Sequence, residues 1–163
     1  MLGTDLMRVF SGSGTLCGLD IDQLDITDAA QCHERILDLR PEVIVNAAAL
    51  TAVDYCESHA EEAFRVNGAG AGNLAAAAAS AGATLLHYST DYVFDGLQEE
   101  PYREDDATAP RSIYGQSKLR GEDLIRAACP QHIILRTAWL FGRNGKNFIF
   151  GAQAAVELRR GQC

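Results

Sequence analysis

The sequence predicts a doubly wound α/β domain built on a parallel sheet, and three observations lead to this prediction. Short apolar runs alternate along the chain with longer segments of helical periodicity. One of these runs, Val43 to Val45, is continuously apolar, as in strands that are buried on both faces. Strands separated by helices of this length form βαβ units, and such units build a parallel sheet.

Length and composition limit the class of protein. The chain has 163 residues, of which 47% are hydrophobic and 22% charged, so we expect residues 1–163 to form one globular domain. The net charge of -8 argues against a nucleic-acid partner, which would require a basic face. No apolar run approaches the ~20 residues of a membrane span and no leader pattern is seen, so we expect no membrane partner and a cytoplasmic protein.

The cysteines and histidines give no metal-binding pattern. The five cysteines lack CxxC spacing, and the four histidines are scattered. We therefore predict no metal site, no disulfide framework and packed, reduced thiols.

The first half of the chain alternates helix and strand. The predicted segments are a helix over 2–10, a loop over 11–14, a strand over 15–21, a helix between the turn at 25–28 and Pro41, and a strand within 42–49 that contains Val43 to Val45. Thr27 or Asp28 provides the N-terminal cap of the second helix, because both side chains can accept a backbone hydrogen bond, and Pro41 ends that helix.

The second half continues the alternation. The predicted segments are a helix over 57–81, a strand over 84–90, a helix over 113–129, a strand over 132–140 and a helix over 148–160. Gly82 provides the stop for the first of these helices. The run Gly68 to Gly72 resembles a phosphate-binding loop, but no strand precedes it, so we interpret it as close helix packing.

A candidate site follows from the rule that ligands bind outside the carboxyl ends of parallel strands. Thr90 ends one predicted strand, and Tyr114 and Lys118 share a face at the start of a helix because they are four residues apart. A nearby ammonium would lower the phenol pKa from about 10. The three side chains suit carbonyl reduction: Thr90 holds the substrate oxygen, Tyr114 donates a proton, and Lys118 tunes the tyrosine.

Seven blocks of sequence point to a family. They are Leu24 to Asp28, Arg40 to Ala49, Thr51 to Asp54, Ser89 to Gly96, Pro101 to Asp105, Tyr114 to Lys118, and Arg136 to Trp139. With these blocks the chain resembles the extended short-chain dehydrogenase/reductase family, and within it the dTDP-4-dehydrorhamnose reductases. The resemblance implies an NAD(P)-binding, Rossmann-like fold, and reduction of the C4 ketone of dTDP-4-dehydro-L-rhamnose to dTDP-L-rhamnose by NADPH or NADH.

The resemblance also implies roles for individual residues. Thr90, Tyr114 and Lys118 correspond to the catalytic set, and Thr90, Asp91 and Trp139 to substrate-binding positions. The implied cofactor-binding positions are Gly3, Asp20, Asp25, Ile26, Ala49, Leu50, Thr51, Tyr88, Tyr114 and Lys118. Asp20 suits a ribose 2′-hydroxyl better than a 2′-phosphate, because two negative groups repel, which favours NADH weakly.

The chain departs from the family pattern at both ends. The resemblance implies a first strand, a glycine-rich turn and a C-terminal substrate domain, of which this sequence has only the last glycine of the turn, Gly3, and the helix after it. Mg²⁺-linked homodimer contacts of the family would also lie outside this chain. We therefore expect a partial domain with an intact catalytic trio, an incomplete cofactor site, weak NAD(P)H binding and little or no turnover.

Several alternatives stay open. Trp139 could be a core residue, and Asp25 could act only as a capping residue. A non-catalytic relative in this family associates with methionine adenosyltransferase, so a regulatory NADP-binding subunit is one alternative. A sugar-nucleotide epimerase or dehydratase is another, although a dehydratase needs an acidic pair and Asp91 supplies one carboxylate.

Overall fold

A three-stranded parallel sheet forms the centre of the larger of two compact units in the computed structural model, which describes residues 2–145. This larger unit spans Leu19–Thr137. Its strands are β1 (Val43–Asn46), β2 (Thr84–Thr90) and β3 (His132–Thr137), in the order β1-β2-β3. Val43 pairs with Thr84, and Leu85 pairs with His132. The parallel sheet is confirmed, as are the predicted bounds of β2.

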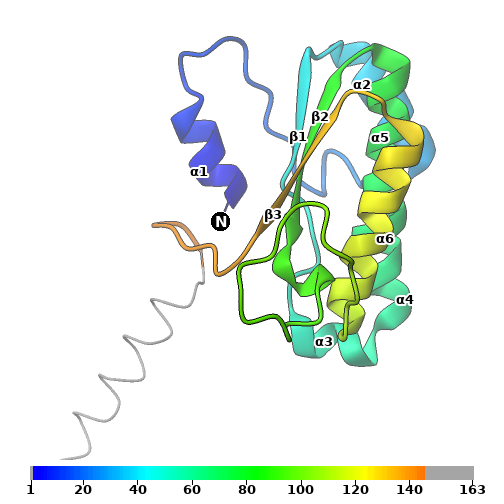
Figure 1. The fold of residues 1–163 in the computed structure, drawn as a ribbon. Helices are drawn as coiled ribbons and strands as arrows, with labels where there is room; N and C mark the ends of the chain where they lie inside the picture. The colour runs from blue at the N-terminus through cyan, green and yellow to red at the C-terminus, as the bar shows by residue number, and fades with distance from the viewer. Residues whose placement is uncertain (1, 146–163) are drawn as a thin grey trace, which may run out of the picture. The chain divides into compact units, whose positions relative to one another are not determined.

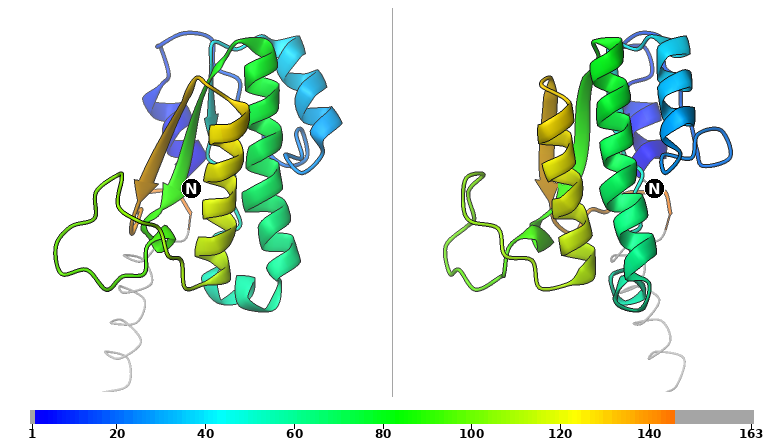
Figure 2. Two further views of the ribbon diagram at one scale, coloured as in Figure 1. Left: turned by 45° about the vertical axis from the view of Figure 1, so that its right-hand side comes forward. Right: turned by 90° about the vertical axis from the view of Figure 1, so that its right-hand side faces the viewer.

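Helices precede β1 and connect the three strands. After α2 (Ala29–Leu39), the segment between β1 and β2 contains α3 (Val53–Ser58), α4 (Ala60–Ala63), a π-helix η1 (Phe64–Gly70) and α5 (Ala71–Ala81). A short 3-10 helix η2 (Asp91–Val93) and α6 (Ile113–Ala128) lie between β2 and β3. Figure 1 and both views of Figure 2 show α2, α5 and α6 covering the same face of the sheet.

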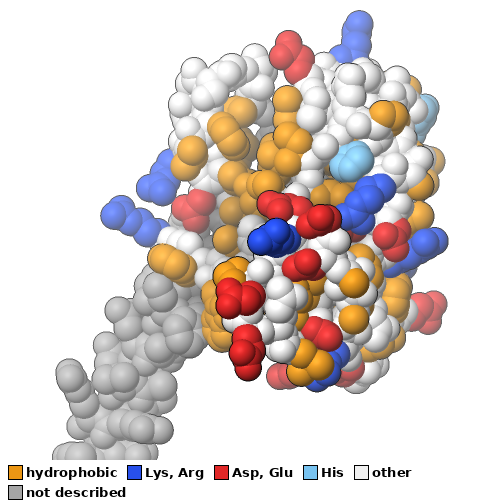
Figure 3. Space-filling view, in the orientation of Figure 1, with side chains coloured by type: hydrophobic (Ala, Val, Ile, Leu, Met, Phe, Trp, Pro, Cys, Tyr) orange, Lys and Arg blue, Asp and Glu red, His pale blue; other side chains and the backbone are white. Residues whose placement is uncertain are grey.

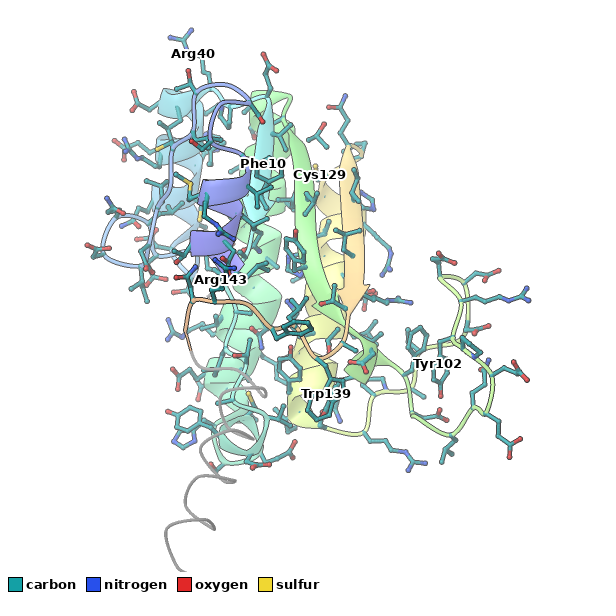
Figure 4. All side chains as sticks on the ribbon, turned by 90° about the vertical axis from the view of Figure 1, so that its left-hand side faces the viewer. Phe10, Arg40, Tyr102, Cys129, Trp139 and Arg143 are labelled. Atoms are coloured by element: carbon teal, nitrogen blue, oxygen red, sulfur yellow. The ribbon has the colours of Figure 1, made fainter. Side chains whose placement is uncertain are left out.

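The helix boundaries have local causes. The Asp28 side chain accepts a hydrogen bond from the Gln31 N–H, so Asp28 caps α2 as predicted. Arg40 ends α2 in the left-handed region, with φ of 45°, and Figure 4 labels it at this end. Gly82 ends α5 at φ 68°, where glycine has no steric cost, so the predicted stop is confirmed.

Two apolar clusters join the helices to the sheet. One contains Leu85 of β2 together with alanines of α5, Ile125 of α6 and Cys129, which Figure 4 labels after α6. The other joins Cys32 and Ile36 of α2 to Leu74 of α5. Alanine side chains let α5 approach its neighbours closely, so the alanine run of the sequence serves as packing surface.

The sheet face away from these helices is apolar and partly open. Val43 and Val45 of β1, and Ile133 and Leu135 of β3, are between 36% and 55% exposed. Within the described part of this unit, β1 pairs with β2 along one edge and with no strand along the other. The continuous apolar sequence of β1 predicted burial on both faces of the strand. In the described part of this unit, helices cover only one of these faces.

Several predicted boundaries were wrong. Residues 15–21 form no strand, because no described strand lies beside them to complete a ladder. The strand predicted over 132–140 ends at Thr137, whereas the strand predicted around Val43 to Val45 is confirmed and ends at Asn46. The helix predicted over 57–81 begins earlier, at Val53, and includes a break at His59 and the π-helix. The helix predicted over 148–160 lies outside the described residues.

The second unit contains residues 1–18 and 138–163, and its described part holds α1 (Leu2–Val9). Asp5 of α1 accepts a hydrogen bond from Asn144 Nδ2 at 2.8 Å and pairs with Arg8 at 3.5 Å. These contacts join α1 to the segment that follows residue 137. Within residues 2–145, no helix combines the length and apolar character needed to cross a membrane.

Candidate active site

Thr90 and Tyr114 meet at the carboxyl end of β2. Thr90 is the last residue of β2, and Tyr114 lies in the first turn of α6, whose N-terminus is capped by Ser112 through the Gly115 N–H. Burial raises the pKa of Tyr114, while a hydrogen bond with Thr90 lowers it, and the net shift is upward. The phenol therefore keeps its proton and can donate it to an oxygen held beside Thr90.

Asp91 and Tyr92 complete the surroundings of the Thr90 hydroxyl. Thr90 Oγ1 donates to Asp91 Oδ1 at 3.1 Å and accepts the Tyr92 N–H at 3.2 Å. The ring of Tyr92 meets that of Tyr114 edge to face, with centroids 5.6 Å apart. These contacts fix the hydroxyl, and they place the exposed Asp91 next to it.

Lys118 lies one turn further along α6, with a side chain only 2% exposed. Its Nζ donates to the Tyr88 carbonyl oxygen at 2.6 Å and lies 3.2 Å from His87 Nε2. Burial lowers the pKa of Lys118 to about 8, although the charge of Glu122 opposes this. The amine is thus directed toward the backbone and side chain of β2.

The expected action of Lys118 on the tyrosine was wrong for this structure. The pKa of Tyr114 is raised rather than lowered, and the groups that act on it are Thr90, Asp91, Cys56 and Tyr92. The physical reason is that the Lys118 amine is occupied by β2, and burial of the phenol outweighs the Thr90 hydrogen bond. The shared helix face brought the two residues together but did not determine what each contacts.

Sequence reasoning missed two buried polar residues next to Lys118. His87 is 1% exposed and Asn46 is 3% exposed, and Asn46 Nδ2 lies 3.0 Å from His87 Nδ1. Burial, followed by the charge of Lys118, lowers the pKa of His87 to about 3, so the imidazole is neutral. His87 precedes Thr90 by three residues on β2, and the available signal was a histidine two residues after Leu85, on the same buried side of the strand.

Sequence reasoning also missed Asn67, which lies in η1 and is 1% exposed. Its Oδ1 accepts the Leu50 N–H at 2.8 Å, and its Nδ2 donates to the Leu50 carbonyl and to Ser117 Oγ, both at 3.0 Å. One side chain therefore fixes the loop after β1 and links it to α6. A π-helix turn often accompanies a functional site, because it displaces one residue out of the regular helix.

The glycines beside Asn67 confirm the close-packing interpretation. A Cβ at Gly70 would lie 2.8 Å from Ile26, and one at Gly72 would lie 3.1 Å from Leu124. A Cβ at Gly68 would lie 3.2 Å from Arg120. The run therefore provides space for neighbouring side chains.

Two loops that carry some of the residues expected on the cofactor side are joined by η1. Thr27 donates to Asp25 Oδ1 from both its N–H and its hydroxyl, and these bonds lower the pKa of Asp25. Arg65 of η1 donates to Thr27 Oγ1 at 2.8 Å. The Ile26 carbonyl accepts from Asn73 at 2.9 Å. Asp25 thus acts as a local turn residue, and its role at a cofactor stays a prediction.

The other expected positions are distributed as follows. Ala49 and Leu50 are half-buried and Thr51 is exposed in the loop after β1, while Asp20 is exposed and accepts the Ile21 N–H at 2.8 Å. Tyr88 contributes its carbonyl oxygen to Lys118. Gly3 and Trp139 belong to the other unit, and Trp139 is 73% exposed with φ of 52°. Their roles stay predictions, and the core interpretation of Trp139 does not fit its exposure.

The loop between η2 and α6 is acidic and is stacked onto β3. The rings of Phe94 and Tyr102 stack with centroids 4.2 Å apart, and the Arg136 guanidinium lies 4.9 Å above Phe94. Figure 4 labels Tyr102 on this loop, and Figure 3 shows acidic side chains gathered where Figure 1 draws it. Among the described residues, no three His, Cys, Asp or Glu side chains are arranged to hold a metal ion.

Comparisons with known proteins agree with this geometry. A family profile described as RmlD substrate binding domain matches residues 1–160. The chain is 42% identical over 151 residues to the dTDP-4-dehydrorhamnose reductase of Salmonella typhimurium. This aligned region covers 90% of this chain and 50% of that protein. The chain spans about half the length of the curated relatives it matches.

Two solved structures have the same arrangement. A dTDP-4-dehydrorhamnose reductase from Clostridium acetobutylicum matches with a TM-score of 0.94 at 40% identity, over 96% of this chain and 56% of that one. One from Bacillus anthracis, in complex with NADP, matches with a TM-score of 0.93 at 36% identity and the same coverage. At these identities, the Rossmann-like fold of the relatives is also the fold of this chain.

Proposed function

Because this chain belongs to the family of the RmlD substrate binding domain, we propose that it carries the catalytic half of an NAD(P)H-dependent dTDP-4-dehydrorhamnose reductase. The observation that supports this best is the group of Thr90, Tyr114 and Lys118 at the carboxyl end of β2. The proposed substrate is dTDP-4-dehydro-L-rhamnose, and the proposed product is dTDP-L-rhamnose.

The loop after β1 fits a dinucleotide. Ala47, Ala48 and Ala49 have little side-chain bulk, and the buried Asn46 and Asn67 accept the N–H groups of Ala48 and Leu50. When bound, the reduced nicotinamide supplies the hydride for the C4 carbon of the sugar. The Bacillus anthracis relative binds NADP, so we propose NADPH or NADH for this chain, with Asp20 favouring NADH weakly.

The residues of this chain would handle the substrate oxygen and its proton. The Thr90 hydroxyl would hold the C4 oxygen, and Tyr114 would donate its phenolic proton to that oxygen as negative charge develops. A raised pKa suits this role, because the phenol is loaded with its proton before the reaction begins. Lys118 would bond the ribose of the cofactor, and Asp91 and Trp139 would contact the sugar.

The proposal includes the cellular location of the enzyme and its partners. We propose a cytoplasmic location, which suits the free, buried thiols of Cys32, Cys56 and Cys129. A homodimer of the complete protein is also part of the proposal, without nucleic acid or membrane as partner.

The test is a chimera in which segments of the Salmonella typhimurium relative that have no counterpart here complete this chain. We expect it to oxidise NADPH when given dTDP-4-dehydro-L-rhamnose, as followed by absorbance. Tyr114→Phe should lower the turnover about 10²- to 10⁴-fold, the usual range for loss of a proton donor. Tyr55→Phe is the control, because this exposed tyrosine stacks on His59 and should not affect turnover.

The outcomes separate the functions. A folded chimera without NADPH oxidation would contradict the reductase, and NADP binding without turnover would favour the regulatory subunit. Turnover that survives Tyr114→Phe would contradict the proposed proton donor.

A further inference from the structure

A chain of buried hydrogen bonds runs from Lys118 to the loop after β1. Lys118 Nζ lies 3.2 Å from His87 Nε2, and His87 Nδ1 lies 3.0 Å from Asn46 Nδ2. Asn46 Oδ1 in turn accepts the Ala48 N–H at 3.0 Å. Lys118, His87 and Asn46 are each at most 3% exposed, so water does not replace these hydrogen-bond partners.

The positions of the hydrogens in this series of hydrogen bonds can be worked out from the Ala48 N–H. The Ala48 N–H can only donate, so the atom of Asn46 that faces it is the carbonyl oxygen. The amide nitrogen of Asn46 then faces His87 Nδ1 and donates to it. A neutral imidazole has one proton, which must therefore be on Nε2 and point at Lys118.

This arrangement fits an uncharged Lys118 and conflicts with a charged one. The uncharged amine has a lone pair that can accept from His87 Nε2–H while one of its hydrogens goes to the Tyr88 carbonyl. A protonated Lys118 has no lone pair, so two donors would face each other. Protonation of the amine therefore requires the His87 proton to move to Nδ1 and the Asn46 amide to turn.

When the Asn46 amide turns, its oxygen faces His87 and no longer accepts the Ala48 N–H. Ala48 is exposed, so its N–H becomes available to solvent or to a ligand. We propose that His87 and Asn46 are positioning residues that couple the charge of Lys118 to the backbone N–H of Ala48. A ligand oxygen that accepts this N–H would favour the protonated amine, by linkage.

The charged surroundings permit this change near neutral pH. Burial lowers the pKa of Lys118 to about 8, and the charge of Glu122 raises it, while Glu122 is itself paired with Arg136 and Arg126. Within the described part of α5, no side chain can titrate. The titratable groups that act on this site are Glu122 on α6, which affects both Lys118 and His87, and His87 and Lys118 themselves; Asp91 and Tyr92 on η2 and Cys56 on α3 act on Tyr114, and Arg136 on β3 pairs with Glu122.

Nuclear magnetic resonance on the ligand-free chain tests the coupling without any turnover. The sequence has two lysines, Lys118 and Lys146, so a spectrum of lysine ¹³Cε has two signals, and Lys118→Gln assigns them. Long-range ¹H–¹⁵N spectra of the imidazole report the tautomer of His87. We expect the Lys118 signal, the His87 tautomer and the Ala48 amide signal to change together, with one midpoint near pH 8.

Asn46→Asp is the decisive variant. Its carboxylate can accept from His87 Nδ1–H and from the Ala48 N–H at the same time, so His87 should stay in the Nδ1–H form between pH 7 and 9. The Ala48 signal should then no longer titrate, and the Lys118 midpoint should rise toward the ordinary value of about 10.4. Asn73→Asp is the matched control, because Asn73 bonds Ile26 and should leave all three signals as in the parent chain.

Two results would overturn the proposal. One is a His87 tautomer that does not change while Lys118 titrates, and the other is an Ala48 signal that titrates as before in Asn46→Asp. The parent chain alone decides the first point if the variant does not fold. The proposal uses the proposed function only for the catalytic role of Lys118, and the experiment contains neither cofactor nor substrate, so the two can fail independently.

Discussion

At the residue scale, the surroundings of Tyr114 favour one half of acid–base chemistry. Burial disfavours the phenolate, and the Thr90 hydrogen bond recovers only part of that cost. The resulting phenol is a proton donor that stays loaded across the neutral range. Reduction of a ketone needs such a donor, whereas the reverse oxidation would need a base at the same position.

Burial of His87 predicts how the stability of the chain depends on pH. Burial and the charge of Lys118 lower the pKa of His87 from 6.5 to about 3. Below pH 6.5 the unfolded chain binds a proton that the folded chain does not, so the free energy of unfolding falls as the pH falls toward 3. One such group contributes at most about 1.4 kcal/mol per pH unit.

Urea unfolding between pH 7 and pH 5 measures this contribution. His87→Gln should reduce the slope of the unfolding free energy against pH by an amount that corresponds to at most one proton, even if the variant is less stable at every pH. His33→Gln, at an exposed position of α2, should keep the parent slope. Equal slopes in the parent chain and His87→Gln would contradict the shifted histidine.

The sequence predicted those site residues whose reactive side chains stand at the end of a strand or the start of a helix. Thr90 and Tyr114 were predicted in this way, because a hydroxyl after a strand and a phenol at a helix start are visible in the letters. His87 and Asn67 were missed, because their partners lie far along the chain: His87 reaches Asn46, and Asn67 reaches Leu50. Sequence spacing on one helix cannot show contacts of this kind.

At the element scale, α6 and η1 approach closely at Gly121. A Cβ there would collide with the Asn67 carbonyl oxygen and lie 3.3 Å from the Ala71 Cβ. Gly121 thus lets η1 lie near enough to α6 for Asn67 to bond Ser117. The contact connects helix packing to the loop after β1, because the same asparagine holds Leu50.

Gly121→Ala should therefore destabilise the chain. We expect a loss of about 1–3 kcal/mol in the free energy of unfolding, as for overpacked cores, measured from the urea midpoint. The Leu50 amide should also exchange faster with solvent, since Asn67 is displaced. Gly3→Ala in α1 has no atom within 4 Å of the new Cβ and should stabilise or leave the chain unchanged. A Gly121→Ala chain as stable as the parent would contradict the tight contact.

Elements with a local cause were predictable, and those that depend on a neighbour were not. The cap at Asp28 and the stop at Gly82 were found because side-chain chemistry and backbone freedom act within a few residues. The strand expected over 15–21 was wrong, because a strand exists only beside another strand. The π-helix was missed for the same reason, since tertiary packing around Asn67 outweighs helical periodicity.

At the scale of the larger unit, Glu122 joins three elements. This carboxylate of α6 has no exposed side-chain surface and accepts from Ser89 of β2 at 2.6 Å, from Arg136 of β3 at 2.7 and 3.0 Å, and from Arg126 at 2.8 Å. Burial would raise the pKa of Glu122, but the hydrogen bonds outweigh it and the net shift is downward. The charged form of Glu122 therefore stabilises the fold.

Removing this charge should destabilise the unit. Glu122→Gln should lower the free energy of unfolding by about 3 kcal/mol, because Arg136 is left without its buried partner. The lowered pKa means that the contribution of Glu122 is complete above about pH 4.3, and it is lost as the pH falls through the folded-state pKa. Thermal unfolding of the parent and the variant should therefore differ most at neutral pH and least in acid.

Glu100→Gln, on the exposed loop after η2, is the control and should leave the unfolding free energy unchanged. A parent chain and Glu122→Gln of equal stability at pH 7 would show that the network contributes nothing. Such a result would mean that Ser89 and Arg136 only pack against residue 122 and gain no stability from its charge.

The strand order also determines when the sheet can form during synthesis. Val43 pairs with Thr84 and Leu85 with His132, so each parallel pairing closes a loop of roughly 40 to 50 residues before any ladder bond forms. On a ribosome, β1 would wait without a partner until β2 has emerged, and the sheet would stay incomplete until Thr137 is free. Its open apolar face would be exposed for that interval, which predicts that formation of the sheet is slow and open to assistance by chaperones.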